Sequence, residues 1–149
     1  MSYKYDVHLK KGWNLLSFFI TNISLDTFIQ NKDIIEIKNL KHSYHRDFHI
    51  TNLKEITLYT AYWIKSEKET LISITGTINK SDITISVSKG WNLVGYPYKF
   101  SSNISSITQN TNISQIKYSN LSYNSLLSST LNTLIEFEPG YGYWFYVEN

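Results

Sequence analysis

Three histidines in the first half of the chain have the one spacing in this sequence that is typical of a metal site. They are His42, His45 and His49. On a helix they would share one face and could ligate zinc together, but the surrounding residues indicate strand and loop. The chain also has two similar halves, described below, and the second carries Leu121, Asn124 and Ser128 at the corresponding positions. These are poor ligands for a transition metal, so we expect no metal site.

The residues of an enzyme active site are missing from the sequence. Without cysteine, the chain has no thiol nucleophile, disulfide or thiolate metal site. It contains no Gly-x-Ser-x-Gly motif, P-loop or Rossmann fingerprint. Asp6 and His8 would share one face of a strand, but no nucleophile accompanies them. We expect a protein that is not an enzyme and needs no cofactor.

A short basic segment is the second candidate for binding chemistry. Its members are Lys38, Lys41, His42 and Arg46, with Tyr44 among them. Cations beside an aromatic ring could contact the phosphates of a nucleic acid. The net charge of +2 is small for such a protein, and no known nucleic-acid-binding motif is present. We favour a solvated surface here, and nucleic-acid binding through the basic face of the first half is an alternative.

All four tryptophans lie in two short motifs, and each motif occurs twice. Lys-Gly-Trp-Asn-Leu spans residues 11–15 and again 89–93, and Tyr-Trp spans residues 62–63 and again 143–144. Weaker matches follow in the same order between them. The signature positions are Gly12, Trp13, Asn14 and Trp63 in the first copy and Gly90, Trp91, Asn92, Tyr143 and Trp144 in the second. Ordered self-similarity of this kind indicates two copies of one structural unit.

Strands must position these motifs. A period of two in Tyr5–Leu9 and in Ile83–Val87 predicts one strand before each Lys-Gly. Trp-Asn-Leu then opens a second strand, so each copy should begin with a tight hairpin. Closing strands are expected over residues 56–65 and 141–147, and short helical turns over 22–30 and 101–109.

The expected fold is mostly β, with two tandem homologous β-rich repeats packed together and short helical turns. The first repeat covers residues 1–66 and the second 83–149, with a connecting strand and turn over 67–82. A repeat of this size is small for an independent core, so we expect one fused globular unit. An aromatic content of 15% and a single alanine, Ala61, both favour strands over helices.

The signature tryptophans have two interpretations. We favour a core role, because both copies of a repeat need the same core and each buried indole N–H could reach a carbonyl. The alternative is a stacking platform for sugars or unstacked bases. Tyr141, Tyr143 and Tyr146 add further rings to the last strand.

The two motifs resemble the ends of β-rich repeat modules found in bacterial surface and secreted proteins. Glu-Pro-Gly-Tyr-Gly-Tyr-Trp at residues 138–144 fits the closing end well, whereas the first copy fits only through Tyr62 and Trp63. The resemblance covers most of the chain and rests on short motifs. It implies a β-rich fold without a catalytic site.

Composition bears on source and location. Thirteen lysines against one arginine, with abundant Ile, Asn and Tyr, indicate an AT-rich genome, which could be bacterial, protist or viral. The sequence shows no signal peptide and no membrane-spanning run. We therefore expect a soluble intracellular protein, or one incorporated into a particle.

The expected function is that of a non-catalytic structural or interaction protein, acting in a larger assembly or as a protein-binding module. Its partner would be another protein or a second copy of itself. Besides nucleic-acid binding, carbohydrate binding through exposed Trp and Tyr side chains is an alternative.

Overall fold

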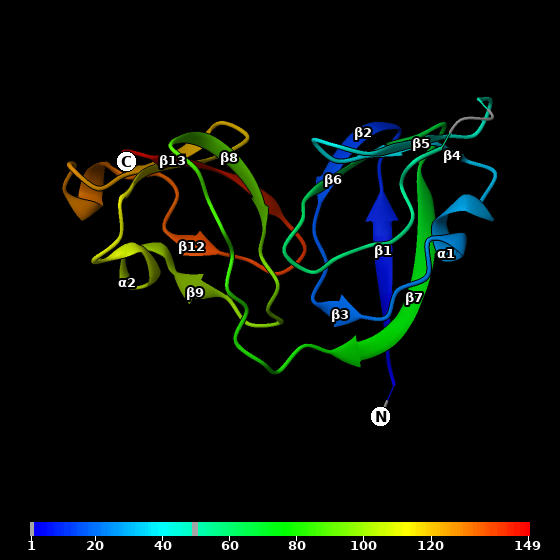
Figure 1. The fold of residues 1–149 in the computed structure, drawn as a ribbon, viewed down its shortest axis with the longest axis horizontal. Helices are drawn as coiled ribbons and strands as arrows, with labels where there is room; N and C mark the ends of the chain where they lie inside the picture. Colours follow the sequence, from blue (N-terminus) through cyan, green and yellow to red (C-terminus); the bar gives the residue numbers. More distant parts are fainter. Residues whose placement is uncertain (1, 49–50) are drawn as a thin grey trace.

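The structure is a computed structural model that describes residues 2–48 and 51–149, and it is mostly β, in two lobes (Figure 1). The first lobe contains β1 (Tyr3–Leu9), β2 (Gly12–Leu16), β3 (Ile20–Thr21), α1 (Asp26–Ile29), β4 (Ile34–Lys38), β5 (Ser43–His45), β6 (Tyr62–Ser66) and β7 (Thr70–Ile78). The second contains β8 (Gly90–Gly95), β9 (Ser102–Asn103), α2 (Ile104–Thr108), β10 (Ile113–Tyr118), β11 (Leu121–Asn124), the 3-10 turn η1 (Ser129–Leu131), β12 (Glu136–Phe137) and β13 (Gly142–Val147). The predicted mostly β fold is confirmed. Over the described ranges, the helices are too short or too polar to cross a lipid bilayer.

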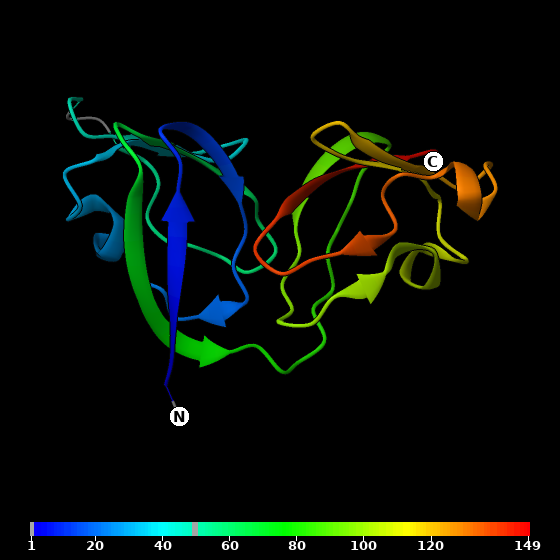
Figure 2. The ribbon, with the colours of Figure 1, turned by 180° about the vertical axis from the view of Figure 1, so that it is seen from behind.

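Each lobe contains one four-stranded antiparallel sheet, and the two sheets have matching strand orders. The order is β2-β6-β4-β5 in the first lobe and β8-β13-β10-β11 in the second. The register corresponds as well, because Leu15 lies opposite Trp63 and Leu93 lies opposite Trp144. Both sheets also have a register shift at the start of the third strand. The view from behind shows the two lobes side by side, linked below by the chain that follows β7 (Figure 2).

The remaining strands differ between the lobes. In the first lobe all of β1 pairs with β7, and the last two residues of β7 pair with β3. The three strands form one sheet. The second lobe has only the short pair β12-β9 in addition to its four-stranded sheet. The strand predicted at Ile83–Val87 is not formed, so that prediction is wrong. The physical reason is that, within residues 2–48 and 51–149, no strand lies beside this segment to pair with it, as β7 does beside β1.

The predicted hairpin at the start of each repeat is also wrong. β1 pairs with β7, whereas β2 pairs with β6, so the two consecutive strands belong to different sheets. The chain turns at Gly12, whose φ of 92° lies in the left-handed region that favours glycine. This turn redirects the chain from one sheet to the other. The predicted helical turns, in contrast, are present as α1 and α2.

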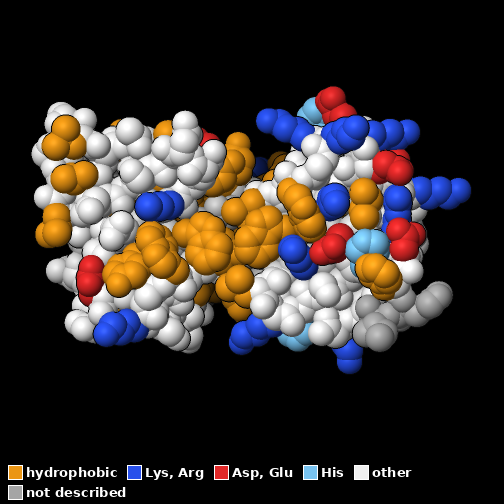
Figure 3. All heavy atoms as spheres, turned by 90° about the horizontal axis from the view of Figure 1, so that it is seen from above, with side chains coloured by type: hydrophobic (Ala, Val, Ile, Leu, Met, Phe, Trp, Pro, Cys, Tyr) orange, Lys and Arg blue, Asp and Glu red, His pale blue; other side chains and the backbone are white. Residues whose placement is uncertain are grey.

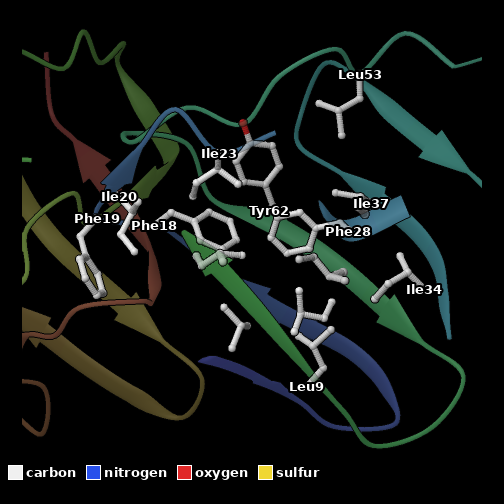
Figure 4. Packing of buried hydrophobic residues seen from close by; sticks show 14 residues of the cluster. Leu9, Phe18, Phe19, Ile20, Ile23, Phe28, Ile34, Ile37, Leu53 and Tyr62 are labelled. Atoms are coloured by element: carbon white, nitrogen blue, oxygen red, sulfur yellow. The ribbon is translucent and has the colours of Figure 1, made fainter. Parts of the chain in front are cut away.

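The two cores reflect this difference. The core of the first lobe is lined by side chains from both of its sheets, from α1 and from the loops between them, and ten of these core residues are labelled in Figure 4. β1 and β7 contribute Val7, Leu9, Ile72 and Ile74 to it. The core of the second lobe is smaller and consists of Tyr96, Ile104, Ile116, Leu134, Phe137 and Tyr143. The three-stranded sheet therefore closes the first core on a side for which the second lobe has no equivalent sheet.

Small residues allow the lobes to approach at backbone distance. The Ser17 N–H donates to the Gly140 carbonyl and the Gly95 N–H donates to the Tyr59 carbonyl, each at 3.0 Å. A Cβ atom at Gly142 would lie 2.5 Å from the Cβ of Ala61. At Gly95 it would lie 2.6 Å from the carbonyl oxygen of Thr60. The lobe junction therefore requires residues with little or no side chain.

The junction gives a first prediction. Gly142→Ala should lower the free energy of unfolding by about 1–3 kcal/mol, because the added methyl group overlaps the Ala61 side chain. The double variant Ala61→Gly/Gly142→Ala moves the same methyl group to the other side of the junction and should recover most of this loss. Urea denaturation of the wild type, both single variants and the double variant measures the coupling. Additive losses would contradict the contact.

Candidate functional site

The Gly-Trp-Asn motif forms the same turn in both lobes. Gly90 has a φ of 96°, close to that of Gly12. The Asn14 side chain accepts from the Lys10 N–H at 3.0 Å and donates to the Lys10 carbonyl at 2.9 Å. Asn92 makes the corresponding bonds with Ser88 at 2.9 and 2.7 Å. Glycine therefore permits the turn, asparagine fixes it, and the tryptophan between them is placed at the start of a strand.

The Tyr-Trp motif divides its two rings between the faces of a strand. Successive strand residues point to opposite faces. Tyr62 and Tyr143 are buried, whereas Trp63 and Trp144 lie on the outer face and are half-buried. The Tyr62 hydroxyl accepts from the Thr57 N–H at 2.9 Å, and the Tyr143 hydroxyl accepts from the Glu138 N–H at 2.8 Å. The tyrosine is therefore the core residue of this motif.

The preferred core role for the tryptophans is consequently wrong. Trp13 and Trp91 are each 45% exposed, and Trp63 and Trp144 are not among the buried core residues. The glycine turn sets the phase of β2 and β8 so that the indole points outward. The buried ring in each core is instead a tyrosine, which is smaller than a tryptophan. Its hydroxyl is hydrogen-bonded to a nearby loop.

These outward rings form one surface, which we call the aromatic stripe. It consists of Trp13, Trp63, Trp144, Tyr146 and Trp91. Trp63 and Trp144 meet across the lobe junction with their ring centroids 6.3 Å apart, and Trp91 packs edge-on against Tyr146 at 5.1 Å. Figure 3 shows a band of hydrophobic side chains that crosses from one lobe to the other. The stripe is therefore a single continuous surface contributed by both lobes.

Lysines are interleaved with the rings of the stripe. The Lys38 ammonium lies 4.6 Å from the ring centroid of Trp13, and Lys65 lies 5.7 Å from the same ring. In the second lobe Lys117 lies 5.4 Å from Trp91. An ammonium group over the face of an indole is attracted by the ring quadrupole, so these cations are held at defined places. The surface offers flat rings and positive charges together.

The structure does not bring the predicted basic segment together as one patch. Lys38 belongs to the stripe, where it also lies 3.8 Å from a carboxylate oxygen of Glu36. Arg46 is instead engaged with Glu67 at 3.3 Å and donates to the Lys32 carbonyl at 2.8 Å. The Arg46 guanidinium is thus paired within the first lobe.

Lys41 and His42 lie at the turn between β4 and β5. Both line a half-open cleft of about 720 Å³ between the lobes. Trp91 lies on the opposite side of this cleft, so the second-lobe end of the stripe opens into it. These two residues of the basic segment therefore face the stripe from across the cleft.

The histidine segment offers no assembled metal site among residues 2–48 and 51–149, where no group of three His, Cys, Asp or Glu side chains could hold an ion. The His45 ring packs on Phe48 with centroids 4.3 Å apart, and its Nδ1 accepts from the Asp47 N–H at 3.1 Å. His49 lies outside the described residues.

Sequence reasoning did not assign Lys65, Lys117 or Tyr146 to the site. For Lys65 and Tyr146, the alternation of side chains along the closing strands would have indicated the outer face. Lys65 is two residues after Trp63, and Tyr146 is two residues after Trp144, so each shares the outer face of its strand with a tryptophan. Lys117 could only be found from pairing, because it lies opposite Trp144 on the neighbouring strand.

Comparison with known proteins adds no relative: no protein-family model matches the chain, and no curated protein and no solved structure matches it. Function must therefore be argued from the geometry of the surface.

A second prediction separates the buried tyrosine of the Tyr-Trp motif from the exposed indole of the Gly-Trp-Asn motif. Tyr143→Ala should cost about 3–5 kcal/mol in the free energy of unfolding, because it leaves a cavity in a buried position. Trp91→Ala should cost about 1 kcal/mol, the value of one ring pair on a half-exposed surface. Chemical denaturation of both variants gives the comparison. A larger loss for Trp91→Ala would mean that the indole supports the fold.

A third prediction concerns alkaline pH. Burial raises the pKa of the Tyr143 hydroxyl from 10.0 to about 12, against the opposing effect of the Glu138 N–H bond. The contribution of the protonated Tyr143 hydroxyl to the free energy of unfolding is therefore complete below pH 10. It is lost as the pH rises towards 12, because this hydroxyl ionises first in the unfolded chain. In Tyr143→Phe the fall in unfolding free energy between pH 10 and pH 12 should be smaller than in the wild type. Tyr59→Phe, at a 49% exposed position, is the control, and equal pH profiles for both variants would refute the prediction.

Proposed function

We propose that the protein is a non-catalytic interaction protein built from two homologous β-rich repeats, with the aromatic stripe as its recognition surface. The matching strand orders, the matching glycine turns and the paired Tyr-Trp strands support the duplication. The motifs Lys-Gly-Trp-Asn-Leu and Gly-Tyr-Trp support grouping the chain with the Gly-Trp-Asn-Leu … Gly-Tyr-Trp repeat modules. Each repeat would contribute half of the recognition surface.

The ligand that best suits the stripe is a single-stranded nucleic acid. The observation that carries this proposal is the placement of a lysine ammonium over each outer indole, at Trp13 and at Trp91. Proteins that bind single strands combine aromatic side chains, on which bases stack, with cations that follow the phosphates. Lys38, Lys65 and Lys117 supply three cations beside the rings, and Lys38 also lies 3.8 Å from a carboxylate oxygen of Glu36.

Two features favour single strands over the other ligands considered. Bases stacked within a duplex have no free faces to offer to the four tryptophans, so a duplex could contact only the lysines. A neutral sugar chain would use the rings without needing the ammonium groups that lie over them. A single strand uses both parts of the surface.

A fourth prediction tests this ligand. Fluorescence titration with an oligothymidylate at low salt should show saturable binding that quenches the exposed indoles. Trp13→Ala or Trp91→Ala should each weaken it about 5- to 150-fold, the range expected for loss of one stacked base. The slope of log K against log salt should be about −2 for three phosphate contacts, and Lys117→Gln should reduce its magnitude by about 0.7.

Lys99→Gln provides a matched control, because Lys99 also lies over an aromatic ring, at 4.5 Å from that of Tyr3, but outside the stripe. It should leave both affinity and salt slope unchanged. Binding of a neutral oligosaccharide that persists at high salt and is lost in Trp91→Ala would assign the stripe to carbohydrate instead. Equal affinity for duplex and single strand would reject the stacking role.

A further inference from the structure

The segment Ile83–Val87 is an extended stretch of the second lobe that lacks a strand partner. Its side chains alternate, with Ile83 and Ile85 half-buried and Thr84 and Ser86 exposed. The Ile83 N–H donates to the Tyr98 hydroxyl at 3.0 Å. Within the described part of the chain, the main-chain groups from Thr84 to Val87 make no hydrogen bond. The segment thus has strand-like alternation and unused main-chain donors and acceptors.

β1 is the segment of the first lobe that corresponds to Ile83–Val87, and it has a strand partner. Both segments immediately precede a Lys-Gly-Trp-Asn turn, and Val7 stands where Ile85 stands in the second lobe. β7 pairs with β1 antiparallel, with Val7 opposite Ile72 and Tyr5 opposite Ile74. Ile72 and Ile74 are 4% and 1% exposed, so this pairing also closes the core.

The helices α1 and α2 also differ in the strand that each one contacts. α1 packs against β7, and its Phe28 is fully buried. α2 contacts β9 instead, and its Ile107 is 48% exposed. α2 therefore packs without a counterpart of β7, with Ile104 and Thr108 as its buried residues and Ile107 on its outer side.

We propose that Ile83–Val87 is an acceptor site for an extended segment of another polypeptide, which adds to the second lobe as an antiparallel strand. The occupant is defined by the strand that fills the equivalent position in the first lobe. It should carry β-branched apolar side chains at two alternate positions, as β7 does at Ile72 and Ile74, with polar side chains between them. Strand addition supplies main-chain hydrogen bonds, and the alternate side chains supply specificity.

This inference rests on the proposed equivalence of the two repeats and is independent of the ligand of the aromatic stripe. The probe is a fluorescent synthetic peptide with the sequence of residues 69–78, Glu-Thr-Leu-Ile-Ser-Ile-Thr-Gly-Thr-Ile. Its fluorescence anisotropy should rise saturably on addition of the intact protein. The peptide with Ile72→Asn and Ile74→Asn should bind at least about tenfold more weakly, because two apolar side chains are lost from the buried face.

Variants of the protein locate the site. Ile85→Lys should weaken peptide binding about tenfold or more, whereas Leu126→Lys, at an 89% exposed position elsewhere in the second lobe, should not. Ser86→Pro keeps the apolar face and removes one main-chain N–H, so it provides the test if Ile85→Lys fails to fold. Circular dichroism identifies such a failure.

The outcomes are distinguishable from those of the oligonucleotide experiment. Ile85→Lys should bind oligothymidylate at least as tightly as the wild type, because Ile85 lines the same cleft as Trp91 and the added ammonium group would attract phosphates. Trp63→Ala should retain peptide binding. An absence of peptide binding, or binding that neither Ile85→Lys nor Ser86→Pro weakens, overturns the acceptor site. A concentration-dependent dimer that Ile85→Lys dissociates, without peptide binding, would show that a second copy covers the segment and would also overturn it.

Discussion

The close approach of two backbones at the lobe junction is the contact on which the rest of the molecule depends. Ala61 meets Gly142, and Gly95 meets the backbone of Thr60, with no room for a larger side chain. Hydrogen bonds from Ser17 and Gly95 fix the same contact in both directions. Only at this distance can Trp63 and Trp144 meet across the junction. A wider junction would break the aromatic stripe into two unconnected halves.

The Tyr-Trp motif places a core residue next to a residue of the proposed recognition surface. Because neighbouring strand residues face opposite sides, a buried tyrosine obliges the next residue to face outward. Tyr62 and Tyr143 fill the cores, and their hydroxyls hold the loops that lead into the junction. The residue that follows each of them is therefore presented on the surface by a strand that the core keeps rigid. Recognition residues placed on such strands are held more precisely than residues on loops.

The lobes share one sheet design and differ in what covers the opposite side of the core. β7 gives the first lobe a second sheet and a larger core. In the second lobe β12 pairs with β9, while Ile83–Val87 stays without a partner. The two lobes thus share the design of their outer face, which we propose binds one continuous ligand, whereas their inner sides differ. This asymmetry confines the proposed strand addition to the second lobe.

The sequence by itself determined the mostly β class, the positions of the two helical turns and the residues that matter at each turn, because Gly, Asn and alternating side chains act locally. It also paired Trp13 with Trp91 and Trp63 with Trp144 as corresponding positions. Tertiary structure decided which face those rings occupy and which lysines join them, since a strand pattern does not say which side meets the core. It likewise decided that β1 pairs with β7 and that Ile83–Val87 pairs with nothing in the described chain. Strand pairing depends on which distant segment is present to supply hydrogen-bond partners, and local patterns carry no information about that.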